Sequence, residues 1–163
     1  MEQGQDCTNI DCGVAVTVHT SCNPFISTTQ VVPKCLTLGM GCRKDKDARG
    51  IAEAAQKVLD RSGFHKEAFE QIASINLKKE EKGILSLSQD WQIPFVTYTE
   101  EELKQVPGEF TPSPFVKKRS QVWTNVCERS AVLASGNGRL LQRKNRRKWC
   151  DHSSGCQGME DTF

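Results

Sequence analysis

The sequence predicts one α/β domain of three layers, α/β/α, around a mostly parallel sheet. Short apolar runs alternate with amphipathic helical stretches from residue 31 onward, which is typical of strand–helix–strand units. The length of 163 residues, with 37% hydrophobic and 26% charged residues, suits a single globular domain. No apolar run approaches the roughly 20 residues that a membrane-spanning helix needs.

The first half of the chain alternates strands and helices. Residues 1–30 are expected to be a linker with one edge strand, because Gly13 to His19 contains an apolar run. A second strand is expected from Val31 to Leu38. An amphipathic helix should follow from Asp47 to Arg61 and end at Gly63, and a short helix should cover residues 65–69.

The second half repeats the alternation. Strands are expected at Ile72–Leu77 and Pro94–Tyr98, on either side of a helix at Glu81–Trp91. Thr99 and Glu102 fit a capping box, and Ser113 is a further candidate N-cap. The remaining elements are a helix at Val126–Ala134, ended by Gly136, and a last strand that opens at Leu140–Gln142.

The segment LTLGMGCRK, residues 36–44, predicts an anion site. Gly39 and Gly41 permit positive φ and close approach of the backbone to a ligand, and the next helix directs free N–H groups toward this loop. Arg43 and Lys44 add two cations, so carboxylate or phosphate is the expected guest. The alternatives are a purely structural glycine turn and a solvated pair of cations. The pattern is neither G-x-G-x-x-G nor a P-loop, so nucleotide binding has little support.

Composition excludes several classes of function. The net charge of +2 is too small to favour nucleic acid as the main partner, and stacking aromatics are missing beside the basic residues 139–148. The N-terminus has no signal-peptide pattern, so the eight cysteines are expected to be reduced thiols in the cytoplasm. No C-x-x-C pair is present, and the cluster of Cys150, His152 and Cys156 is not expected to bind a metal.

Five motifs occur in one order along the chain. They are LTLGMGCRK (36–44), SINLKKEEKGILSLSQ (74–89), PSPFV (112–116), NVCERSAVLASG (125–136) and LLQRK (140–144). In this order and spacing, residues 31–144 resemble the C-terminal domain of the CbiG family, the cobalt-precorrin-5A hydrolases of anaerobic cobalamin (vitamin B12) biosynthesis. That domain is similar to the stand-alone CobE proteins of the aerobic pathway. The resemblance implies opening of a lactone by water with release of acetaldehyde, or, alternatively, a non-catalytic CobE-like accessory that binds tetrapyrroles.

The resemblance also implies partners and site residues. The ligand would be cobalt-precorrin-5A or a related corrinoid, whose cobalt belongs to the substrate, so no cofactor is expected. An N-terminal CbiG domain or other cobalamin-pathway enzymes are further expected partners, whereas nucleic acid and membrane are not. The predicted substrate-binding residues are Gly39, Gly41, Arg43, Lys44, Ser113 and Lys144, and the predicted catalytic residues are Lys78, Glu81 and Glu128.

Both predicted catalytic carboxylates have structural alternatives. Glu81 is either a general base or a first-turn helix residue favoured by the helix dipole. Glu128 is either an acid or base of the site or a carboxylate that caps a helix N-terminus. Asn76 stands where the family has an acidic residue, so a role for that acid cannot be transferred to this chain.

Residues 145–163 form an irregular tail without apolar periodicity. When permissible codons are read one nucleotide later, they give TEENGVTIAVAAKEWKIH, which contains an alternating apolar strand. Trp149 followed by Cys150 can then yield only Gly, and Met159 followed by Glu160 only Trp. We interpret the tail as a frameshift product, and residues 119–124 fit a similar slip. The alternative is a genuine disordered basic tail.

Overall fold

A five-stranded sheet forms the centre of the computed structural model, which describes residues 11–42, 45–110, 126–142 and 156–161. Its strands are β3 (Leu36–Gly41), β4 (Phe69–Ile75), β5 (Phe95–Tyr98), β6 (Arg139–Gln142) and β7 (Cys156–Asp161). The strand order is β5-β4-β3-β7-β6. β3, β4 and β5 are mutually parallel, and β7 is antiparallel to both β3 and β6. The predicted mostly parallel sheet is therefore confirmed.

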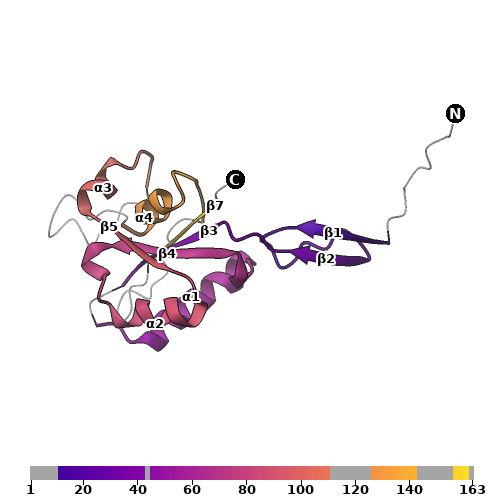
Figure 1. Cartoon of the computed structure of the whole chain (residues 1–163), viewed down its shortest axis with the longest axis horizontal. Helices are drawn as coiled ribbons and strands as arrows, with labels where there is room; N and C mark the ends of the chain where they lie inside the picture. The colour runs from indigo at the N-terminus through magenta and orange to yellow at the C-terminus, as the bar shows by residue number, and fades with distance from the viewer. Residues whose placement is uncertain (1–10, 43–44, 111–125, 143–155, 162–163) are drawn as a thin grey trace.

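The larger core lies between the sheet and two helices, α1 (Ala48–Ser62) and α2 (Lys82–Trp91), which share one face of the sheet (Figure 1). Alternate residues of β3 point into this core, because side chains along a strand alternate between the two faces. The buried residues contributed by the sheet are Leu36, Leu38, Met40, Phe69 and Ile72. Those contributed by the two helices are Ile51, Ala55, Val58, Leu59, Ile84 and Leu87.

The opposite face of the sheet carries α4 (Val126–Ala134), with α3 (Glu100–Gln105) beside it (Figure 1). α4 packs very close to β3, since a Cβ on Gly39 would overlap the carbonyl oxygen of Cys127 and lie 2.9 Å from the Cβ of Ala131. The hydroxyl of Ser130 donates to the carbonyl of Ala73 at 3.3 Å. Helices thus cover both faces, as the α/β/α prediction requires.

Several predicted helix ends are confirmed. Gly63 adopts the left-handed conformation (φ 66°) after α1, and its N–H donates to the carbonyl of Leu59. Thr99 and Glu102 form the capping box of α3: the Glu102 N–H donates to the Thr99 hydroxyl at 3.3 Å, and the Thr99 N–H donates to the Glu102 carboxylate at 2.6 Å. The predicted N-cap Ser113 lies outside the described residues.

The N-terminal strands differ from the prediction. β1 (Cys12–Val16) and β2 (Ser27–Val31) pair with each other in parallel, in a two-stranded ribbon separate from the main sheet. The strand expected at Val31–Leu38 is divided, because β2 ends at Val31 and β3 begins at Leu36. Pro33 lies between them and has no N–H to donate to a strand ladder, which explains the break.

Two more boundaries and the tail need correction. β4 begins at Phe69, and the expected end of that strand is instead a 3₁₀ turn, η2 (Asn76–Lys78). The short helix expected over 65–69 is a 3₁₀ turn, η1 (Lys66–Ala68). Residues 156–161, expected in an irregular tail, form β7 between β3 and β6. Backbone pairing there overrides the poor strand propensity of the sequence CQGMED.

Candidate functional site

Helices α1, α2 and α4 direct their N-termini toward one edge of the sheet, where the parallel strands have their carboxyl ends, and the short α3 also begins there after β5. α1 follows β3 and α2 follows β4. Their first turns lie side by side because Gly83 has no side chain: a Cβ there would be 2.9 Å from the Lys46 carbonyl oxygen. α4 runs antiparallel to the strands, because Cys127 lies over Gly39 while Ala134 accepts a hydrogen bond from Gln71, which pairs with Thr37 near the start of β3, so α4 also directs its N-terminus toward this edge. Helix N-termini carry partial positive charge, so the edge favours anions.

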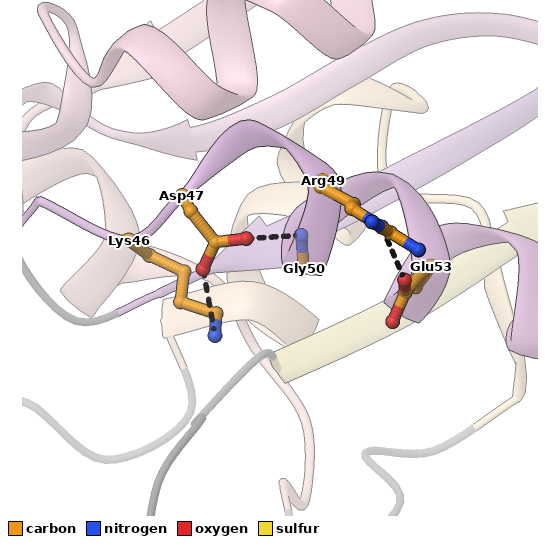
Figure 2. A network of polar contacts seen from close by, with 5 residues as sticks. All are labelled: Lys46, Asp47, Arg49, Gly50 and Glu53. Atoms are coloured by element: carbon orange, nitrogen blue, oxygen red, sulfur yellow. Dashed lines mark hydrogen bonds and ion pairs between the residues drawn. The ribbon is translucent and has the colours of Figure 1, made fainter.

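The N-terminus of α1 is capped by Asp47 (Figure 2). The carboxylate accepts a hydrogen bond from the Gly50 N–H at 2.7 Å and forms an ion pair with the Lys46 ammonium at 3.1 Å. The Gly50 N–H, and then Lys46, lower the pKa of Asp47 below its usual value. One turn further, Arg49 and Glu53 pair at 3.1 Å on the exposed side of the helix. The side chain of Lys46 is only 21% exposed, so this cation is held at the edge.

The N-terminus of α2 is built differently. Glu81 is its N-cap residue, but its side chain makes no capping hydrogen bond. Instead, the Glu81 carboxylate accepts a hydrogen bond from the Lys78 ammonium at 3.0 Å, and the two side chains are 8% and 15% exposed. Sequence analysis named both residues, and the structure brings them together. A largely buried acid and cation in contact are the groups needed to bind an anion and to move a proton.

Tyr98 also belongs to this edge, although the sequence analysis did not propose it. It is the last residue of β5 and pairs with Ile75, the last residue of β4. Burial, and then the negative charge of Glu102, raise the pKa of the Tyr98 phenol. The hydroxyl, like that of any tyrosine, is protonated at neutral pH and can donate a hydrogen bond. Its place at the end of a predicted strand, just before a capping box, is the pattern that could have revealed it.

The two glycines of the predicted anion loop do not adopt the expected conformation. Both lie within β3, and neither has positive φ. Gly39 is buried beneath α4, so its missing side chain serves helix packing, whereas Gly41 ends β3 at the edge. Among the described residues of this connection, which exclude 43 and 44, Asp45 has positive φ (58°). The predicted ligands Arg43, Lys44, Ser113 and Lys144 lie outside the described residues.

Glu128 lies in the first turn of α4 and has no solvent-exposed surface. Its helix directs it toward the same edge as Lys78, but the carboxylate is enclosed by protein. A catalytic role for Glu128 therefore stays a prediction, and it would require α4 or its surroundings to open.

Neither a metal cluster nor the hollow at the other edge adds to this site. The described residues contain no group of three His, Cys, Asp or Glu side chains that could hold a metal ion. A hollow of about 350 Å³, lined in part by Thr20, Leu59, Phe64 and His65, lies at the C-terminal end of α1, away from the carboxyl edge. Within the described ranges, no helix is long and apolar enough to span a membrane.

The fold and the site together define an α/β domain whose sheet has a carboxyl edge lined by helix N-termini and by Lys46 and Lys78. The chain belongs to the family described as the cobalamin synthesis G C-terminus, whose model matches residues 36–153. The family expected from the five sequence motifs is therefore confirmed.

Two curated relatives are cobalt-precorrin-5A hydrolases. The protein from Salmonella typhimurium is 33% identical over 89 residues, which is 55% of this chain and 25% of the relative. The protein from Priestia megaterium is 33% identical over 104 residues, which is 64% of this chain and 27% of the relative. The chain thus spans about a quarter of the length of these relatives.

Solved structures show the same fold. CobE, from the cobalamin (vitamin B12) biosynthetic pathway, has a TM-score of 0.66 at 23% identity, covering 81% of this chain and 93% of CobE. A cobalamin biosynthesis protein G homologue from Sulfolobus solfataricus has a TM-score of 0.59 at 21% identity, covering 93% of this chain and 44% of that protein. The protein chiG from Agrobacterium tumefaciens has a TM-score of 0.58 at 20% identity, covering 78% of this chain and 98% of that protein.

Proposed function

We propose that this chain acts in cytoplasmic cobalamin biosynthesis as the C-terminal part of a cobalt-precorrin-5A hydrolase. Membership of the family supports the pathway, and the two curated relatives support the reaction. One structural observation supports the location of the site: α1 and α2 begin side by side, with Lys46 and Lys78 at their N-termini. The corrinoid would present its peripheral carboxylates to this edge.

The charges of the edge suit such a ligand. Each helix N-terminus stabilises a nearby anion by about 0.3–1 kcal/mol when the contact is exposed to solvent. Lys78 is only 15% exposed, so salt should screen its attraction for a carboxylate less than that of a surface lysine. Several carboxylates on one rigid macrocycle could then engage several of these groups at once. We expect affinity to come from this combination of contacts.

The Lys78–Glu81 pair is our proposal for the chemical step. Opening a lactone with water needs a base to take the proton of the water and a positive group near the oxygen that gains negative charge. If a substrate oxygen replaces Glu81 as the partner of Lys78, the Glu81 carboxylate becomes free to accept that proton. Glu128 remains a second candidate for acid–base catalysis, and Tyr98 a candidate hydrogen-bond donor to the substrate.

The test measures binding and turnover separately. The chain is incubated with cobalt-precorrin-5A, alone and with the part of the Salmonella typhimurium hydrolase that this chain does not match, while bound corrinoid and released acetaldehyde are followed. Lys78→Met should weaken binding. Lys66→Met is the control, because Lys66 precedes β4 and so lies at the other edge of the sheet.

Three outcomes are informative. Acetaldehyde release in either mixture, lost with Lys78→Met or Glu81→Gln, would support the hydrolase. Corrinoid binding without acetaldehyde in both mixtures would favour the CobE-like accessory role. Absence of corrinoid binding, or equal binding by wild type and Lys78→Met, would contradict the proposed site.

A further inference from the structure

The ribbon of β1 and β2 has one covered face. The side-chain amide of Gln30 donates to the carbonyl oxygens of Thr20 and Cys22 at 3.3 and 2.9 Å. The ring of Phe25 lies over Gly13, where a Cβ would overlap it. The segment that connects the two strands therefore folds back over this face, covers it and provides its hydrogen-bond partners.

The other face of the ribbon is bare. The strand register places Cys12 beside Ser27, Val14 beside Thr29, and Val16 beside Val31, and all six residues are exposed. Val14, Val16 and Val31 have 61%, 69% and 48% of their surface exposed, and Ile26, just before β2, has 86%. None of these residues is charged. Parallel strands normally have both faces covered, and a lone two-stranded sheet is marginal in water, so this face is suited to a further layer of polypeptide.

The base of the ribbon is fixed to the main domain. The Thr20 N–H donates to the Gly63 carbonyl, and the His65 N–H donates to the Val18 carbonyl, both at 2.8 Å. The His65 ring nitrogen Nε2 also lies 2.8 Å from the side-chain oxygen of Gln30. The ribbon consequently projects from the domain in a defined direction, with its outer end away from the five-stranded sheet (Figure 1).

The similar structures indicate which polypeptide accompanies such a ribbon. The match to the Sulfolobus solfataricus protein covers 93% of the 163 residues, so the roughly 11 residues that it omits are too few to leave out the whole of residues 12–31. Only 44% of that protein is matched, and the rest is additional polypeptide. CobE and the Agrobacterium protein, which are matched over 93% and 98% of their own lengths, cover only 81% and 78% of this chain. The match that must include part of the ribbon is thus to the longer protein, whereas the other two matches omit enough residues to leave the ribbon out.

We propose that the bare face of the ribbon, formed by Val14, Val16 and Val31, docks the part of the longer family proteins that this chain does not match. The docking surface of that partner is apolar and uncharged, because an unpaired charge buried against these valines would be costly. The inference concerns assembly and does not depend on hydrolase activity.

The first experiment measures docking in trans. The unmatched part of the Salmonella typhimurium hydrolase is checked for folding by circular dichroism and titrated onto this chain. We expect complex formation, with slower amide hydrogen exchange in residues 12–16 and 27–31. The double variant Val14→Lys/Val16→Lys should bind at least about tenfold more weakly. Leu85→Lys, at an apolar residue of α2 that is 39% exposed, is the control and should bind like wild type.

The second experiment does not require a separate fragment. Residues 12–163 replace the matched quarter of the Salmonella hydrolase, and thermal unfolding of the chimera is followed. We expect a single cooperative transition, which Val14→Lys/Val16→Lys splits or lowers and Leu85→Lys preserves. Equal behaviour of the two variants in both experiments would overturn the proposal. Dimerisation of this chain alone that the two lysines abolish would also overturn it, since a second copy would then be the occupant.

Discussion

The side-chain amide of Gln71 donates a 2.8 Å hydrogen bond to the carbonyl oxygen of Ala134, the last residue of α4. The same amide lies 3.3 Å from the Thr37 hydroxyl, so one side chain joins β3, β4 and the C-terminus of α4. This contact, at the opposite end of α4 from Cys127, holds the C-terminus of the helix over the start of β3. The N-terminus of α4 is thereby aimed at the carboxyl edge.

Gln71→Leu should lower the free energy of unfolding by about 1–3 kcal/mol, because the Ala134 carbonyl would lose its partner in a half-buried place. Chemical denaturation measures the change. Gln56→Leu is the control: its amide bonds to Asp60 at 2.9 Å on the exposed side of α1, so we expect a change within about 0.5 kcal/mol. Similar losses for the two variants would show that Gln71 does not hold α4.

Gly39→Ala should destabilise the domain by about 1–3 kcal/mol or more, because the new Cβ would meet backbone, which cannot easily move. Gly50→Ala is the matched control. Its Cβ would meet only side-chain ends, the end of the Lys46 side chain at 2.7 Å from Cε and the Asp47 carboxylate at 3.1 Å, and alanine favours a helix by up to about 1 kcal/mol over glycine. In thermal unfolding, the melting temperature should therefore fall for Gly39→Ala and rise for Gly50→Ala. A harmless Gly39→Ala would mean that α4 does not pack as described.

Asp47→Ala should destabilise the protein at neutral pH and have progressively less effect in acid. The pKa of Asp47 is lowered in the folded state by the Gly50 N–H and by Lys46, so the carboxylate contributes stability above its unfolded pKa. That contribution disappears as the pH falls through the lowered, folded-state pKa. The check is the melting temperature of both proteins from pH 7 downward. A difference that does not depend on pH would contradict the cap.

Lys78→Met and Glu81→Gln should not be additive. Each single change leaves the other member of a largely buried pair without its partner, whereas the double variant removes both charges. Unfolding free energies in a double-mutant cycle should therefore give a coupling of about 0.5–3 kcal/mol. The control cycle uses Lys104 and Glu100, which pair at 3.2 Å but are 48% and 34% exposed, and should give about 0.3–0.5 kcal/mol. Equal coupling energies in the two cycles would show that burial does not strengthen the Lys78–Glu81 interaction.

Replacing residues 145–163 by TEENGVTIAVAAKEWKIH should raise the melting temperature. β7 has the sequence CQGMED, which lacks the β-branched and aromatic residues that stabilise an interior strand. The alternative tail contains such residues in alternation. Sequencing the source DNA tests the frameshift itself. Equal or higher stability for the chain as it stands would argue for a genuine tail.

Most of the helices could be predicted from the sequence because their signals, apolar spacing and capping residues, lie within a few residues of one another. Apolar spacing located α1 and α2 to within a residue or two, and the capping pair Thr99 and Glu102 located α3. The misplaced elements depend on pairing between distant segments. β1 and β2 stand apart from the main sheet, and β7 pairs with β3 although its composition does not favour a strand.

The candidate site was predicted only in part. The contact between Lys78 and Glu81 follows from their spacing of three residues, which brings side chains together in a helical turn. The burial of Gly39 under α4, the approach of α1 to α2 at Gly83, and the place of Tyr98 beside Ile75 all depend on tertiary packing. The glycine pattern alone therefore predicted that Gly39 lies beside a bound ligand, whereas in the structure it lies beside α4.

Tyr98 provides a spectroscopic probe of the carboxyl edge. It is the chain's only tyrosine, so absorbance of tyrosinate at high pH follows this single phenol, and tryptophan adds no ionisation of its own. The Glu102 charge already contributes to the raised pKa of Tyr98. An anionic ligand bound beside the ring would raise the pKa of Tyr98 further, so binding at this edge could be followed without a label.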